Sequence, residues 1–235
     1  MTTLFLCLFV LYLLYAVIAN RTEQDGAPRK QSKLTLFLQS PVFLLSVWMG
    51  VEQGVVSRDL VSPIMIGAGL LLGHLVFGVS LLVTHRELRE STEHVLDLGA
   101  LWRFLVENPN LLFRFLAVSL TEELIYRVAA QPMLIAATGN AVAGILVTAA
   151  AFSVIHWHFF RNPVIQSAEF LAFALLLGCL YHWTGSFSLV VTIHTVRNLE
   201  IVYLEYLVKL SEVGDEQQAM QAVEAQYVRQ SAESQ

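Results

Sequence analysis

The stretch Thr121-Glu122-Glu123-Leu124-Ile125-Tyr126-Arg127 places two carboxylates and a guanidinium inside a segment that otherwise resembles a membrane-spanning helix. The flanking residues 110–120 and 128–137 are apolar enough to insert into a bilayer. An ionised group at the centre of a bilayer costs about 3 kcal/mol even on lenient insertion scales. Three such groups in one span therefore indicate a functional site.

Helix geometry predicts different roles for these three groups. Glu123 and Arg127 are four positions apart, so they share a helix face and can neutralise each other as a structural ion pair. Glu122 points about 100° away from that face and is free to act as a base. The alternative is that the three groups only hold helices together or line a transport path.

The composition indicates an all-α, polytopic helical membrane protein. Hydrophobic residues make up 56% of the 235, and charged residues only 14%, well below the roughly 25% of soluble domains. The apolar residues fall in blocks long enough to cross a hydrocarbon core about 30 Å thick. The net charge of −5 comes without a basic patch, so nucleic acid is not an expected partner.

The apolar blocks predict about seven transmembrane helices, with an interfacial amphipathic helix before the fourth. The expected spans are 3–19, 34–50, 60–84, 111–138, 141–160, 164–183 and 187–207, and the amphipathic segment is 85–109. Residues 1–210 are interpreted as a single transmembrane domain with a motif-bearing core at 111–207. Residues 211–235 are expected to be a polar cytoplasmic tail.

The distribution of positive charges predicts the orientation, because cytoplasmic loops of membrane proteins are enriched in Lys and Arg. With the N-terminus outside, the outer loops hold only Arg58. The inner loops then hold Arg21, Arg29, Lys30, Lys33, Arg86, Arg89, Arg103, Arg161 and Lys209. The C-terminus is therefore expected in the cytoplasm. The small size and short loops suggest a bacterial protein, for which the cytoplasmic (cell inner) membrane is the expected location.

Two later spans also contain polar residues at helical spacing. Phe152 and His156 are four positions apart in the fifth span, and His194 and Asn198 are four apart in the seventh. Each pair is expected to share a helix face. Together with Glu122, these side chains would give three spans with polar faces that can meet.

These residue types suit hydrolysis of a peptide bond without a Ser or Cys nucleophile. A carboxylate and a neutral imidazole can orient and deprotonate a water, and an imidazole with a side-chain amide can stabilise an oxyanion. Glu122, His156 and His194 could instead be ligands of a zinc ion that keeps an open coordination position. The His-Glu-x-x-His helix motif is absent, so the metal-free reading is favoured and no cofactor is expected. A non-catalytic membrane protein for binding or transport is a further alternative, although no paired repeats are visible.

The three motifs together resemble the CPBP family of intramembrane proteases. They are Glu122-Glu123-x-x-x-Arg127, Phe152-x-x-x-His156 and His194-x-x-x-Asn198, in this order on successive late spans. The family, also called Abi, includes the CAAX prenyl endopeptidases, and its members have often been labelled metalloproteases. The resemblance covers about residues 111–207.

The resemblance also implies roles and a substrate class. Glu122 and His156 correspond to the water-activating pair, and His194 with Asn198 to the oxyanion-stabilising pair. Glu123 and Arg127 complete the first motif. The implied activity is that of an endopeptidase that cuts near the cytoplasmic membrane face, in CAAX-type or bacterial C-terminal and peptide processing. The implied partners are the lipid bilayer and a membrane-associated protein or peptide, which can be lipidated.

Overall fold

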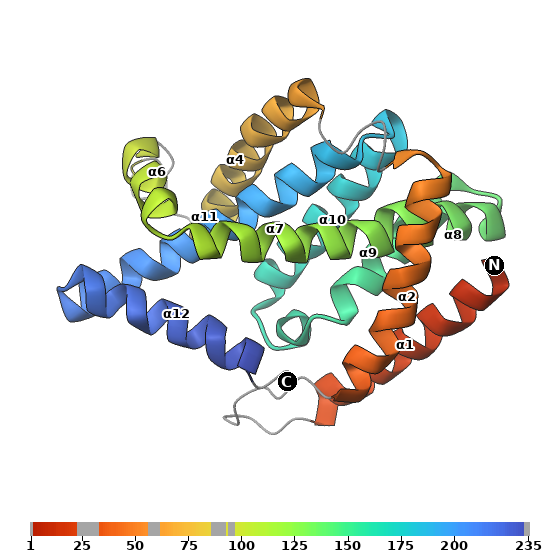
Figure 1. Ribbon diagram of the computed structural model, residues 1–235, viewed down its shortest axis with the longest axis horizontal. Coiled ribbons are helices and arrows are strands. Elements are labelled where there is room, and N and C mark those ends of the chain that lie inside the picture. The colour runs from red at the N-terminus through yellow and green to blue at the C-terminus, as the bar shows by residue number, and fades with distance from the viewer. Residues whose placement is uncertain (1, 23–32, 56–61, 86–92, 94–96, 233–235) are drawn as a thin grey trace.

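The computed structural model describes residues 2–22, 33–55, 62–85, 93 and 97–232, and these residues contain helices and no strand. Figure 1 shows the helices crossing one another around a central group formed by α7, α10 and α11. Several charges used to predict the orientation lie outside the described residues, namely Arg29, Lys30, Arg58, Arg86 and Arg89.

Five helices of the described part are long and apolar enough to cross a membrane. They are α1 (Thr2–Thr22), α2 (Lys33–Glu52), α4 (Pro63–His85), α10 (Val164–Thr184) and α11 (Phe187–Val213). They correspond to the first, second, third, sixth and seventh predicted spans. The predicted class, an all-α polytopic membrane protein, is confirmed.

The predicted fourth span is one continuous helical stretch made of three pieces. It consists of α7 (Pro109–Glu123), a π-helical segment η1 (Leu124–Ala130) and α8 (Gln131–Thr138). In the π-helical segment the backbone hydrogen bonds reach back five residues, as from the N–H of Gln131 to the carbonyl of Tyr126. Pro132 follows immediately and has no N–H to donate, which favours an irregular ladder here. The stretch ends at Gly139, whose φ of +64° is left-handed.

The predicted fifth span is shorter than expected, so its boundary at residue 160 is wrong. Helix α9 covers Ala141–Val154, and a 3₁₀ turn, η2 (Trp157–Phe160), follows. In a continuing helix, the carbonyl of Phe152 would accept from the N–H of His156. The imidazole of His156 binds that carbonyl instead. The backbone N–H of His156 donates to the carbonyl of Ser153, three residues back. A side chain thus replaces the backbone donor at the last turn.

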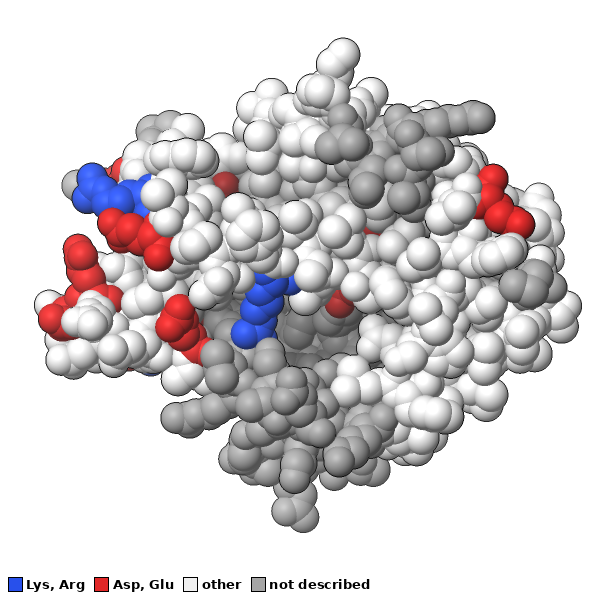
Figure 2. Space-filling view, viewed as in Figure 1, with Lys and Arg blue, Asp and Glu red and all other residues white. Residues whose placement is uncertain are grey.

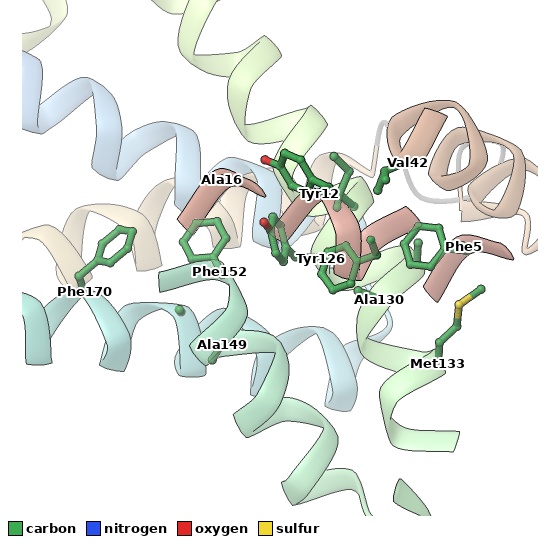
Figure 3. Packing of buried hydrophobic residues seen from close by; sticks show 14 residues of the cluster. Phe5, Tyr12, Ala16, Val42, Tyr126, Ala130, Met133, Ala149, Phe152 and Phe170 are labelled. Atoms are coloured by element: carbon green, nitrogen blue, oxygen red, sulfur yellow. The ribbon is translucent and has the colours of Figure 1, made fainter. Parts of the chain in front are cut away.

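Helix α11 packs against α4, α7 and α12 and forms the centre of the molecule. Glycines allow α4 to approach it closely, because a Cβ at Gly73 would lie 2.8 Å from the Cβ of Val196. On the other side, α2 packs against the π-helical segment, and α1 contacts it through the rings of Phe9 and Tyr126. Figure 3 shows the aromatic core of this half, in which Tyr126 lies near Phe152. This core fixes the part of the chain that follows the paired glutamates.

The remaining helices lie at one end of the molecule. Helix α6 (Leu98–Glu107) begins at Asp97, whose side chain accepts a hydrogen bond from the N–H of Ala100. It is the described part of the predicted amphipathic segment; residues 86–92 and 94–96 of that segment lie outside the described residues. Helix α12 (Glu216–Ala232) folds back, and its buried Val223 joins a cluster with Phe104 of α6. Figure 2 shows charged side chains gathered at this end, whereas most of the visible face is uncharged. This distribution is expected when the charged end lies at the membrane surface and the uncharged face lies within the membrane.

Candidate active site

The structure brings Glu122, His156 and His194 together from three separate elements. Oε1 of Glu122 lies 3.7 Å from Nε2 of His156, and its Oε2 lies 3.6 Å from Nε2 of His194. Glu122 lies in the last turn of α7, His156 follows α9, and His194 lies in α11. The convergence of polar faces predicted from the sequence is therefore present in the fold.

His156 reaches the site from a turn and not from a helix face. Its backbone is extended (φ −82°, ψ 117°), and its Nδ1 lies 2.6 Å from the carbonyl oxygen of Phe152. The two rings lie 4.7 Å apart between centroids. The association of Phe152 with His156 predicted from their spacing is present, but the helical geometry assumed for His156 is wrong.

The carboxylate of Glu123 connects two buried groups. Its Oε2 lies 3.2 Å from Nε of Arg127, as the i, i+4 spacing predicted. Its Oε1 lies 2.8 Å from Nδ1 of His194, a contact that the spacing did not reveal. Arg127 also donates to the carbonyl of Ala174 in α10. Glu123 therefore both pairs with Arg127 and holds the ring of His194.

The partners of the two imidazoles indicate their tautomers. The carbonyl of Phe152 can only accept a hydrogen bond, so Nδ1 of His156 is the donor. The ionised carboxylate of Glu123 likewise only accepts, so Nδ1 of His194 donates to it. In the neutral rings, both Nε2 atoms then present lone pairs to Glu122. Distances of 3.6 and 3.7 Å exceed a direct hydrogen bond, and a water that donates between these acceptors would satisfy them.

Exposure separates an open side of the site from an enclosed one. The side chains of Glu122 and His156 are 20% and 21% exposed, whereas that of His194 is 4% exposed. Water can therefore reach Glu122 and His156 more readily than His194. Asn198 is half-buried on α11, one helical turn beyond His194.

Aromatic rings enclose the buried side of the site. Phe152 makes an edge contact with His194 at 5.9 Å between centroids, and Phe173 makes another at 5.7 Å. The guanidinium of Arg127 lies 5.3 Å from the centroid of the Phe152 ring. These rings lower the local polarity, which strengthens the electrostatic interactions among the charged groups.

The zinc alternative names Glu122, His156 and His194 as ligands, and the structure places the two Nε2 atoms 3.7 and 3.6 Å from the carboxylate of Glu122. The lone pairs that face Glu122 would attract a cation. However, no group of three or more His, Cys, Asp and Glu side chains in the described ranges is placed so that it could hold a metal ion.

A second buried polar network lies next to the site on α11, beyond the ring of Phe173 that contacts both His194 and Arg197, and sequence reasoning missed it. NH2 of Arg197 lies 2.8 Å from Oε2 of Glu169 in α10, and Ser80 of α4 also donates to Glu169. One turn further along α11, Glu200 lies 2.6 Å from Nδ1 of His74. The signal that found Glu122, a carboxylate within an apolar span, also marks Glu169 and Glu200.

The fold and the site together define a polytopic helical membrane protein with a glutamate and two histidines joined inside its core. A family model described as "Type II CAAX prenyl endopeptidase Rce1-like" matches residues 104–199. The matched segment contains all three motifs, from Glu122 to Asn198, and confirms the resemblance predicted from them. No curated protein and no solved structure matches the chain.

Proposed function

We propose that the protein is an intramembrane endopeptidase that uses a water activated by Glu122 and His156. The match of residues 104–199 to prenyl endopeptidases supports a CAAX-type protease. The observation that carries the mechanism is the approach of the Glu122 carboxylate to both histidines, at 3.6 and 3.7 Å. The half-open position of Glu122 and His156 gives the water a path to the base.

In this mechanism a water lies between Glu122 and Nε2 of His156 and donates a hydrogen bond to each. Glu122 removes a proton as the water oxygen attacks the carbonyl carbon of the scissile peptide bond. A tetrahedral intermediate with an oxyanion results. Glu122 then gives the proton to the amide nitrogen as the C–N bond breaks, and a carboxyl terminus and a free amine are released.

His194 and Asn198 are proposed to stabilise the oxyanion. In this step the ring of His194 carries a hydrogen on both nitrogens, in place of the lone pair on Nε2 of the neutral ring, so that Nδ1 still donates to Glu123 and Nε2 donates to the oxyanion. The side-chain amide of Asn198 supplies a second donor.

The substrate is proposed to be a membrane-associated, lipidated peptide, cut near the cytoplasmic face of a bacterial membrane. Helix α6 and the fold-back of α12 would then lie on the cytoplasmic side. Figure 2 shows a hollow below α7 on the face that it draws, with an acidic and a basic side chain on its walls. Such a hollow would admit a peptide from the face that Figure 2 draws.

The test compares the native protein with Glu122→Gln, both purified and returned to liposomes with a farnesylated CAAX peptide. We expect the native protein to cleave the peptide and Glu122→Gln to be at least 100-fold slower, the usual size of a lost general base. Glu107→Gln, an exposed carboxylate of α6, is the matched control and should match the native rate. Full activity of Glu122→Gln would overturn the mechanism.

A metal assay on the same preparations tests the zinc-dependent version. We expect metal well below one equivalent and unchanged cleavage after chelation. Stoichiometric zinc, with activity lost on chelation and restored by zinc, would instead assign Glu122, His156 and His194 as ligands. Membrane-protein termini compared between cells carrying the native chain and Glu122→Gln would then identify the natural substrate.

A further inference from the structure

Arg197 is a buried cation beside the candidate site that the proposed mechanism does not use. It lies on α11 three residues after His194, so the two side chains share one side of that helix. NH2 of Arg197 lies 2.8 Å from Oε2 and 3.1 Å from Oε1 of Glu169. Ser80 of α4 donates to the same carboxylate. These contacts hold the guanidinium in one place between α4, α10 and α11.

Two phenylalanine rings of α10 lie against the guanidinium. The centroids of Phe173 and Phe170 lie 4.4 and 5.8 Å from Cζ of Arg197. Both distances are within the limit of about 6 Å for attraction between a cation and a ring face. Nε of Arg197 is buried and has no hydrogen-bond partner in the described part of the chain. The two rings therefore supplement the charge compensation that Glu169 provides.

Each of these rings also contacts one histidine of the candidate site. Phe173 makes an edge contact with His194 at 5.7 Å between centroids, and Phe170 makes one with His156 at 4.9 Å. The two phenylalanines are three positions apart on α10, so they share a helix face. One guanidinium thus touches both of the rings that pack on the two imidazoles.

The order of the contacts shows how the ion pair fixes the register of α10 against α11. Glu169 precedes Phe173 by four residues on α10, whereas Arg197 follows His194 by three residues on α11. In this antiparallel pair of helices, the contact of Glu169 with Arg197 and that of Phe173 with His194 lie about one turn apart. A shift along either helix would therefore break both contacts.

A buried ion pair is a weak source of stability, because the loss of hydration offsets much of the attraction. Ionisable residues within membrane spans more often serve a function. We propose that Arg197 is a positioning residue of the protease, held in place by Glu169. Through the two rings of α10, it keeps the imidazoles of His156 and His194 turned toward Glu122. This proposal rests on the proposed protease function.

The first experiment removes the ion pair without leaving a buried charge unpaired. The double variant Glu169→Gln, Arg197→Met is assayed in liposomes with the farnesylated CAAX peptide. Misplaced histidines lose interactions made in the transition state, so we expect kcat to fall roughly 10-fold or more with KM nearly unchanged. The matched control, His74→Gln, Glu200→Gln, removes a buried pair one turn further along α11 and should keep the native kcat. Native kcat in the first variant, or equal losses in both, would overturn the proposal.

A second variant keeps the shape of the core and changes only the charge distribution of one ring. A trifluorinated phenylalanine in place of Phe173 retains the packing but lacks the negative ring face that attracts a cation. We expect kcat to fall roughly 3-fold or more, the effect of a weakened contact with Arg197. The same replacement at Phe187, a buried ring of another core cluster, should have no effect. Native kcat with the fluorinated ring at position 173 would overturn the role of the cation.

The third measurement does not depend on cleavage. Histidines labelled with nitrogen-15 are observed by NMR, and the signals of His156 and His194 are assigned by their loss in His156→Gln and His194→Gln. We expect both signals to shift or broaden in Glu169→Gln, Arg197→Met and to stay in place in the control. Unchanged signals would overturn the positioning role, even if cleavage is slow. If the native protein cleaves no peptide, the proposed function fails, and the signals still decide whether Arg197 orients the imidazoles.

Discussion

Oε1 of Glu123 lies 2.8 Å from Nδ1 of His194, so the second carboxylate of the first motif orients an imidazole of the third. The same carboxylate pairs with Arg127, which in turn binds the backbone of α10 at Ala174. Three elements are thereby joined behind the site. The two neighbouring glutamates consequently have different surroundings, one enclosed and one open toward water.

Replacing Glu123 is expected to affect stability as well as activity. Glu123→Ala leaves the buried guanidinium of Arg127 without its charge partner, a change that costs about 3 kcal/mol or more. Glu122→Ala removes a partly exposed group and should change the stability little. Thermal unfolding of both variants in detergent checks this difference. A native-like Tm for Glu123→Ala would show that the ion pair is not structurally important.

The histidines at 156 and 158 provide a matched pair for testing the base. His156→Ala removes the group next to Glu122 and should slow peptide cleavage by roughly 100-fold or more. His158 lies in the same segment as His156, and its ring packs against Phe170 of α10. Replacement of His158 by Ala should change the rate by only a few fold. Single-turnover cleavage of a prenylated peptide measures both. Similar losses in the two variants would indicate a general disturbance of the turn.

The pair formed by Glu169 and Arg197 is expected to show strong coupling. Glu169→Ala leaves Arg197 buried and unpaired, so the single variant should lose about 3 kcal/mol of stability. The double variant Glu169→Ala, Arg197→Met removes both charges and should be more stable than Glu169→Ala alone. A double-mutant cycle built from unfolding measurements gives the coupling energy. Additive effects would show that the two side chains do not interact.

Close approach of α8 and α9 should make Gly144 intolerant of any side chain. A Cβ there would lie 2.7 Å from the backbone of Ile135, whereas a Cβ at Gly67 has nothing within 4 Å. Gly144→Ala should therefore reduce the yield of folded protein. Gly67→Ala should be neutral or stabilising by up to about 1 kcal/mol, the helix-propensity gain of Ala over Gly. Size-exclusion profiles and Tm values distinguish the two.

The polar residues of the motifs could be predicted because charge is rare in a membrane span. Glu122, Glu123 and Arg127 stand out against apolar neighbours, and i, i+4 spacing correctly predicted the contact between Glu123 and Arg127. The hydrogen bond from His194 to Glu123 could not be predicted, since it joins distant segments whose relative rotation depends on packing. Glu169 could have been found by the rule that marked Glu122.

The sequence did not predict where the backbone departs from a regular α-helix. An apolar run of suitable length predicts a helix but does not locate its last hydrogen bond. Helix α9 therefore ends at Val154, because the imidazole of His156 takes a backbone acceptor. The π-helical segment is equally invisible to apolar periodicity, since every residue from Leu124 to Ala130 is buried.

That π-helical segment sets the rotational phase between the two halves of the motif-bearing span. Before it, Glu123 faces His194 in α11; after it, Gln131 donates to the carbonyl of Gly178 in α10. A regular α-helix would need one residue fewer over this turn, so an α-helix with the same number of residues would rotate everything beyond it by about 100°. Conversion of residues 124–130 to a regular α-helix without loss of a residue would therefore break the Gln131 contact or the Glu123 contact, whereas deletion of one residue between 128 and 130 would let an α-helix keep both contacts. The π-helical segment thus holds two helices at a fixed relative rotation. Helix α7 faces His194 of the candidate site, and α8 contacts α10 through Gln131.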